Sequence, residues 1–293
     1  MLSLHTNNAA LSAQNSLSRT QSTLSTSMTR LSTGYRINSA MDDAAGLQIA
    51  TRLKTQTSGM QVAMRNTQNS ISMLQTADGA LDQTTNILNR MKDLATQAAD
   101  GSSTAADKTA MQGEYDSLAD ELTNIFGNTK FGGTELFKTT GGKLNAAISF
   151  QIGADSAEKL DADFTTELGT ATDATSGIGS ISTRFSADNA APGGVGTELT
   201  ASANATISKL ATAIDSVSAL RSKIGAVSNR LDHVNSNLSN ISTNTKAAAG
   251  RIMDVDFATE SASMTSNQML LQAGTAMLKQ SNSQSSLVMS LLQ

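Results

Sequence analysis

Site chemistry requires nucleophiles, bases or metal ligands at suitable spacings, and this chain has few of them. It contains no cysteine and only two histidines, His5 and His233. Neither histidine has another three or four residues away, so no zinc-ligand spacing can be built. No serine lies in a Gly-x-Ser-x-Gly turn, and no glycine-rich motif ends in Gly-Lys-Ser/Thr to hold phosphate groups. The sequence therefore predicts no catalytic residue, no cofactor and no metal, and we expect a non-enzyme.

Composition favours long helices over a compact globular core. Aromatic residues make up 3% of the 293 residues, and there is one proline. Large aromatic side chains fill much of a globular core, and proline interrupts helices. The net charge of −4 lacks the basic excess of a nucleic-acid binder. No apolar run approaches the ~20 residues of a membrane span, and residues 1–10 lack signal-peptide features. We expect no nucleic acid, no membrane insertion and no cleaved signal.

Seven-residue repeats of apolar side chains occur in both halves of the chain. The first repeat lies in residues 1–41, at Leu17, Leu24 and Leu31. A second repeat, between Asp42 and Asp100, comprises Leu53, Met60, Leu74, Leu81, Leu88 and Ala95. A third runs without interruption from Ala203 to Ile252. Sustained heptads of this kind predict long coiled-coil helices.

The middle of the chain changes period. Ile148, Phe150 and Ile152 alternate with polar residues after the Gly141-Gly142 pair, which predicts a β-hairpin within residues 128–152. Residues 153–197 are rich in Gly, Ser, Thr and Ala. Such a composition fits a loop, a few short strands or a small subdomain.

The predicted fold is mainly α, with long antiparallel coiled-coil helices formed by the N- and C-terminal arms, a β-hairpin, and a short irregular or β-rich central region. We divide it into three domains. Residues 1–42 and 253–293 form a terminal coiled-coil inner core. Residues 43–152 and 198–252 form a helical rod that includes the hairpin at 128–152. Residues 153–197 form a short, variable, surface-exposed region.

The segment Ser261–Gln293 carries one charge, Lys279, and has apolar residues at helical spacing. A helix so weakly charged must be covered in a soluble assembly. Residues 1–41 can cover only part of it, so we expect neighbouring copies of the chain to cover the rest. The predicted assembly interface comprises Leu17, Leu24, Leu31, Met264, Leu271, Leu278 and Leu291.

Two long motifs resemble those of the bacterial flagellin family. The N-terminal motif runs Arg-Leu-Ser-Thr-Gly-Tyr-Arg-Ile-Asn-Ser-Ala over residues 30–40, followed by Asp-Asp-Ala-Ala-Gly-Leu over residues 42–47. The C-terminal motifs are residues 225–231, Gly-Ala-Val-Ser-Asn-Arg-Leu, then 254–258 and 272–278. The resemblance covers nearly all of the chain except about residues 153–200. Both motifs stand at the ends where the family has them.

The resemblance implies a structural subunit that is exported unfolded by the flagellar type III apparatus and polymerises into the extracellular filament for swimming motility. It also implies an export chaperone, a filament cap and hook-associated proteins as partners. The family's outer helices carry a surface sensed by an animal Toll-like receptor, and the matching residues are Arg90, Leu94 and Glu114. The stretch 29–50 resembles the epitope of a plant innate immune receptor.

Two alternatives to a filament subunit stay open. A hook-associated or junction protein of the flagellum would share the terminal coiled coil but would not polymerise indefinitely. A non-flagellar coiled-coil adapter would use the same helices to bind other proteins. Electron microscopy of the purified protein distinguishes these possibilities, because only a filament subunit forms long filaments.

Overall fold

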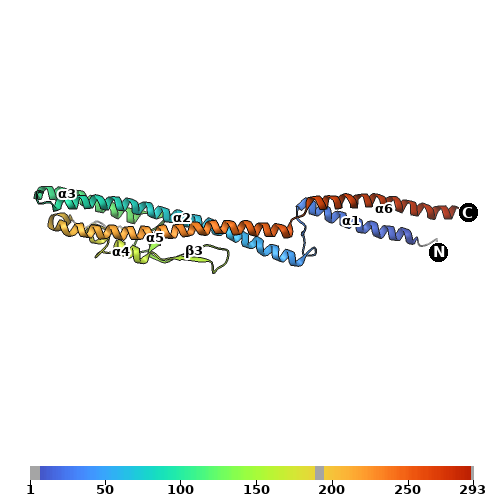
Figure 1. The fold of residues 1–293 in the computed structure, drawn as a ribbon, viewed down its shortest axis with the longest axis horizontal. Helices are drawn as coiled ribbons and strands as arrows, with labels where there is room; N and C mark the ends of the chain where they lie inside the picture. The colour runs from blue at the N-terminus through green and yellow to red at the C-terminus, as the bar shows by residue number, and fades with distance from the viewer. Residues whose placement is uncertain (1–6, 189–194, 292–293) are drawn as a thin grey trace. The chain divides into compact units, whose positions relative to one another are not determined.

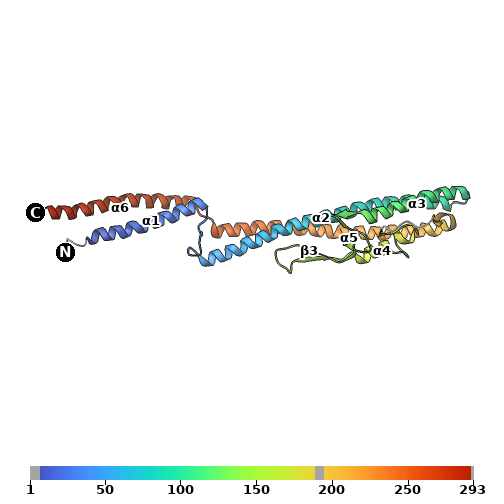
Figure 2. The same ribbon diagram turned by 180° about the vertical axis from the view of Figure 1, so that it is seen from behind.

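The computed structural model describes the backbone of residues 7–188 and 195–291, and the side chains of the last helix as far as Ser283. These residues form six α-helices and two small antiparallel strand pairs (Figure 1, Figure 2). The chain divides into two compact units. We call residues 1–57 with 243–293 the terminal unit, and residues 58–242 the middle unit. The predicted mainly α fold with a small β region is confirmed.

In the terminal unit, α1 (Asn8–Thr33) and α6 (Phe257–Leu291) lie side by side and antiparallel (Figure 1). α1 begins after Asn7, whose side-chain oxygen accepts the Ala10 N–H at 3.1 Å and so satisfies a free amide of the first turn. The helix ends at Gly34, whose φ of 76° is the left-handed conformation that glycine adopts most easily. The ends of α1 are therefore set by its own sequence.

The middle unit is built on three helices, α2 (Ala44–Ala99), α3 (Ala105–Asn128) and α5 (Glu198–Met253). The unit boundaries after Thr57 and Ser242 fall inside α2 and α5. Both predicted long helices are confirmed, and their heptad rows are buried. The buried members within the middle unit are Met60, Thr67, Leu74, Leu81, Leu88 and Ala95 on α2, and Ala203, Leu210, Val217, Ile224, Leu231 and Leu238 on α5.

The compact units differ from the predicted domains. The terminal unit reaches to residue 57 and resumes at 243, whereas the predicted inner core ends at 42 and resumes at 253. Apart from Asp43, the additional residues belong to the first turns of α2 and the last turns of α5. The predicted division assigns an inner core, a rod and a variable region to these parts of the chain, and it stays a prediction.

A β-hairpin forms within residues 128–152 as predicted, but the alternating stretch at residues 148–152 is not one of its strands. A short hairpin does form there, with β1 (Lys130–Phe131) joined to β2 (Thr134–Glu135) by Gly132 and Gly133. The φ values of these two glycines, 58° and 84°, suit a tight two-residue hairpin turn. The alternating stretch β3 (Ile148–Gln151) instead pairs with β4 (Lys159–Ala162). A period of two predicts a strand, but it does not identify the partner strand.

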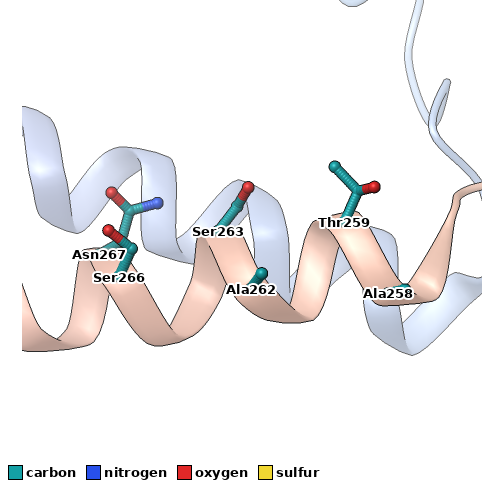
Figure 3. Close-up of a pocket in the computed structure, with 6 residues that line it drawn as sticks. All are labelled: Ala258, Thr259, Ala262, Ser263, Ser266 and Asn267. Carbon is teal, nitrogen blue, oxygen red and sulfur yellow. The ribbon is translucent and has the colours of Figure 1, made fainter.

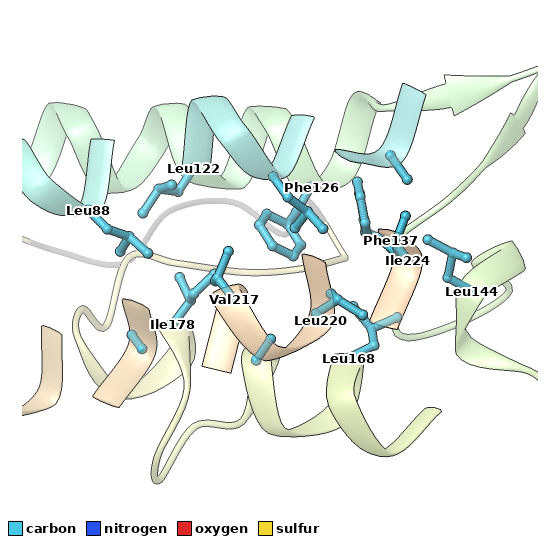
Figure 4. Packing of buried hydrophobic residues seen from close by; sticks show 14 of the residues in the cluster. Leu88, Leu122, Phe126, Phe137, Leu144, Leu168, Ile178, Val217, Leu220 and Ile224 are labelled. Atoms are coloured by element: carbon cyan, nitrogen blue, oxygen red, sulfur yellow. The ribbon is translucent and has the colours of Figure 1, made fainter. Parts of the chain in front are cut away.

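Residues 153–188 of the predicted surface-exposed region carry buried apolar side chains as well as exposed polar ones, and the role of the region stays a prediction. β4, α4 (Thr165–Thr172) and the 3-10 turn at Ile178–Ser180 pack against the long helices, and their buried side chains join one core (Figure 4). Figure 4 shows Leu168 and Ile178 beside Val217 and Leu220 of α5. The members from this region are Leu160, Ala162, Phe164, Leu168, Ala171, Ile178 and Ile181.

Two polar contacts and one aromatic contact hold the segment after the 3-10 turn against α3. The buried Tyr115 hydroxyl donates to the Ile181 carbonyl at 2.7 Å, and burial raises the pKa of Tyr115. Arg184 donates to both carboxylate oxygens of Asp120, at 3.0 and 2.6 Å. The ring of Phe185 packs edge-on against Phe126, with centroids 5.5 Å apart. Residues 181–185 are thus fixed to α3 by side chains of three kinds.

Removing a core side chain of the middle unit should destabilise it strongly. Leu81 is fully buried, so Leu81→Ala should lower the free energy of unfolding by roughly 2–5 kcal/mol through lost burial and the cavity left behind. Met41→Ala is the control, because that side chain is 97% exposed and its removal should change stability by less than about 0.5 kcal/mol. Urea unfolding of both variants checks this, and equal effects would contradict the assigned core.

Candidate assembly surface

The α1–α6 pair is positioned by contacts along its length. Arg30 forms an ion pair with Glu260, with Nη1 and Oε2 3.8 Å apart. The Cδ1 atom of Leu17 lies close to Gly274, 3.0 Å from where a Cβ would stand. Asn7 Nδ2 donates to the carbonyl and the hydroxyl of Ser281, both at 3.2 Å. From Arg30 back to Asn7 along the first segment, the partner moves forward from Glu260 to Ser281 along the second. The two helices are therefore antiparallel.

Two hydrogen-bonded linkers fix where the pair begins. The Arg36 N–H donates to the Met253 carbonyl at 2.6 Å, and the Val255 N–H donates to the Gly34 carbonyl at 3.0 Å. The Arg36 guanidinium also donates to the Ile252 carbonyl at 2.9 Å, which satisfies an acceptor at the end of α5. The segments after α1 and after α5 are therefore joined as a short antiparallel ladder.

Carboxylates that accept hydrogen bonds hold the turns beside this ladder. Asp42 Oδ2 accepts the N–H groups of Ser39 at 2.9 Å and Asn38 at 3.1 Å, and also the Ser39 hydroxyl. These bonds, the one from the Ser39 amide first, lower the pKa of Asp42. Asp256 accepts the Thr259 hydroxyl and the Ala258 N–H at the start of α6, and its pKa is lowered for the same reason.

The predicted interface residues lie largely between the two helices of one chain. Their side chains are all half-buried: Leu17, Leu24 and Leu31 on α1, and Met264, Leu271 and Leu278 on α6. The side chain of Leu291 lies outside the described residues. In the single chain, these rows therefore help α1 and α6 to cover each other, which leaves only part of their surface for another copy.

A different set of apolar side chains is exposed on the same helices. Leu11 and Met28 on α1 and four residues of α6 are each between 50% and 69% exposed; the four are Phe257, Met269, Leu270 and Met277. We call these six residues the exposed row for short; of the four on α6, only Leu270 and Met277 share one helical face. The predicted interface does not include Leu270 and Met277, although they stand seven residues apart, one position before Leu271 and Leu278.

A shallow hollow lies along the first turns of α6 (Figure 3). Small side chains line it: Ala258, Thr259, Ala262, Ser263, Ser266 and Asn267. The hollow is open to solvent and has no charged side chain. Its small residues leave room for a neighbouring helix to come close to the α6 backbone.

Metal-binding clusters and membrane-spanning helices are both absent from the described residues. No cluster of three His, Cys, Asp or Glu residues that could bind a metal occurs among them. His233 is exposed on α5, and His5 lies outside the described residues. In the part of the chain that the structure covers, no helix is long and apolar enough to cross a lipid bilayer.

The three candidate receptor residues differ in exposure. Arg90 on α2 and Glu114 on α3 form an ion pair, with Nη2 and Oε1 2.7 Å apart, and both side chains are about half exposed. Leu94 is 3% exposed and belongs to the core below them. The pair Arg90–Glu114 is therefore accessible in the single chain, and Leu94 is not.

The chain is mainly helical, most of its long heptad rows are buried, and its end helices expose large apolar side chains, which is the architecture of a coiled-coil protein. Residues 4–142 match the model of the bacterial flagellin N-terminal helical region, and residues 207–292 match that of the C-terminal helical region. The chain belongs to the bacterial flagellin family, the structural subunits of the flagellar filament.

Curated relatives agree over the whole chain. Flagellin B and flagellin A of Vibrio anguillarum are 33% and 34% identical over alignments of 377 and 382 residues that cover 99–100% of both chains. Because this chain has 293 residues, an alignment of 377 positions includes at least 84 residues of the relative without a counterpart here. A hook-associated protein structure from Vibrio parahaemolyticus, with a TM-score of 0.57 and 18% identity over 73% of this chain and all of its own, shares the fold.

Protonation of Asp42 should release the turn at residues 38–42. A carboxylate with a lowered pKa stabilises the folded turn at pH values above its ordinary pKa of 3.8, and this contribution is lost as the pH falls through the folded value. In an NMR titration, the Ser39 amide and the Asp42 carboxyl should therefore shift together with a midpoint below 3.8. Asp42→Asn should abolish the Ser39 transition. A midpoint at or above 3.8 would show that the bonds do not favour the carboxylate.

Proposed function

We propose that this chain self-assembles into the helical flagellar filament through the exposed row of α1 and α6. The observation that carries the proposal is that six large apolar side chains are in solvent among the described residues of the paired end helices. Fully burying one such side chain contributes roughly 1.5–3 kcal/mol, and association costs roughly 4–15 kcal/mol. Several members of the row must therefore be covered together, which favours contact with more than one neighbour.

Heterologous contact between copies explains an open polymer. When one surface of a subunit binds a different surface of the next, the contacts continue along a helix unless the rotation closes them into a ring. The low charge of α1 and α6 lets many copies pack closely, because their charged residues are Arg19, Arg30, Glu260 and Lys279. The interface residues predicted from the sequence remain proposed contacts between copies beside the exposed row; they are Leu17, Leu24, Leu31, Met264, Leu271, Leu278 and Leu291.

We further propose that the protein is exported unfolded through the type III apparatus and works outside the cell. Its other partners are an export chaperone, the filament cap and the hook-associated proteins. The family match and the absence of cysteine, which avoids cross-links in an unfolded chain, support this route. A junction protein is the alternative, but the likeness to a hook-associated protein at 18% identity supports the fold only.

Deleting residues 261–293 should abolish polymerisation, because most of the exposed row on α6 is removed. Electron microscopy and sedimentation of the full chain and the truncated chain, at equal concentration, measure this. The truncated protein should stay monomeric where the full chain forms filaments. If the truncated chain still polymerises, the end helices do not drive assembly.

A finer test changes only the exposed row. The double variant Leu270→Asp, Met277→Asp places charges where a neighbour should bind and should weaken that contact. We expect the concentration needed for filaments to rise at least about tenfold, which corresponds to a loss of ~1.4 kcal/mol. The matched control is Leu270→Met with Met277→Leu, which keeps the row apolar and should polymerise normally. Equal assembly by both variants, measured by sedimentation, would rule out the exposed row as the contact.

We also propose that the accessible pair Arg90–Glu114 contributes to recognition by an innate immune receptor of the Toll-like class, and that residues 29–50 can be recognised by a plant receptor. The charge swap Arg90→Glu, Glu114→Arg keeps an ion pair between α2 and α3 but reverses the charges presented. It should reduce receptor signalling in reporter cells while the circular dichroism of the protein stays unchanged. Unchanged signalling would remove this pair from the recognition surface.

A further inference from the structure

Gly59 stands in the interior of α2, where glycine weakens a helix more than any residue except proline. A helix of 56 residues could hold almost any other residue at such a position. A glycine inside a helix therefore calls for a packing reason. The surroundings of Gly59 supply one.

The turn between β3 and β4 closes on Gly59. A Cβ atom at position 59 would lie 2.6 Å from the Cβ of Ala154 and 3.2 Å from its Cα. The methyl group of Ala154 thus occupies the place that a side chain at position 59 would need. Both residues belong to the middle unit. By contrast, nothing lies within 4 Å of a Cβ built at Gly79, the other interior glycine of α2.

The turn is too well bonded to yield locally. The Gln151 side-chain amide donates to the carbonyl oxygens of Gly153, Asp155 and Glu158, at 3.1, 2.6 and 3.1 Å. The Ile152 N–H donates to the Glu158 carbonyl at 3.0 Å, and the Asp155 N–H donates to the Glu158 carboxylate at 3.0 Å. A side chain at position 59 would therefore displace the whole turn.

The remainder of the hairpin is held elsewhere. Phe150 and Leu160, which are paired in register, are buried in the core of the middle unit. A two-stranded ribbon without further packing is only marginally stable in water. Beyond these residues Ile152 also packs against the core, so the contact at Gly59 bears on the turn that follows it, residues 153–158.

We propose that Gly59 is a positioning residue and that the β3–β4 hairpin is a strap fastened to α2 by Ala154. While Ala154 is in contact with Gly59, the turn at residues 152–158 is held in one orientation. With the strap released, the tips of both strands separate from α2 and their free edges become available for pairing with other strands. The inference concerns the subunit alone, so it does not depend on filament formation.

Hydrogen exchange of the full chain, followed by mass spectrometry, tests the strap. Gly59→Ala should speed exchange in the peptide covering residues 150–160 on the order of tenfold, because the turn opens more often. Gly79→Ala is the matched control, since it makes the same change in the same helix without a contact, and should leave that peptide unchanged. Equal exchange in the wild type and Gly59→Ala would overturn the proposal.

A compensating change separates steric release from a general loss of structure. Ala154→Gly removes the methyl group that meets position 59, so the double variant Gly59→Ala, Ala154→Gly should exchange more slowly than Gly59→Ala alone. Ala154→Gly by itself gives the reference for added turn flexibility. If the two changes are simply additive in the double-mutant cycle, the contact does not couple these residues and the strap is rejected.

Discussion

Two paired helices can cover only one face of each other. The end helices α1 and α6 have this constraint and almost no charge, and the rest of the structure depends on it. α1 and α6 bring together Leu17, Leu24 and Leu31 with Met264, Leu271 and Leu278 as half-buried side chains. A pair of helices has no third element to cover its outer faces, so Leu270, Met277 and the others of the exposed row remain in solvent. Other copies of the chain can cover them. The ladder at Arg36 and Val255 fixes where this pair starts.

The middle unit also has apolar helix faces, and other segments of the same chain cover them. Three long helices with few aromatic residues leave space that the segment from β3 to residue 185 fills with Phe150, Phe164, Leu168 and Ile178. Tyr115 and Asp120 of α3 then hold the end of that segment. This unit is therefore covered by its own residues. By contrast, the terminal unit leaves large apolar side chains of α1 and α6 exposed.

The long helices could be predicted because each heptad row, such as Leu210 to Leu238, is buried on one face and any slip would expose it. Strand pairing could not, because the alternation at Ile148 and Phe150 defines a strand without naming its partner. The buried residues of 153–188 stand among Ser, Thr and Gly without a period. The candidate interface was predicted only in part, because the spacing of Leu271 and Leu278 indicates burial but does not say which helix buries them.

The central claim is that the exposed row of α1 and α6 is the surface by which copies of the chain bind one another. A helical reconstruction of the assembled protein by electron cryomicroscopy tests it directly. The account predicts that Met28, Met269, Leu270 and Met277 are buried against neighbouring copies. Filaments in which these four side chains remain in contact with solvent, with subunits joined through the middle unit alone, would contradict it.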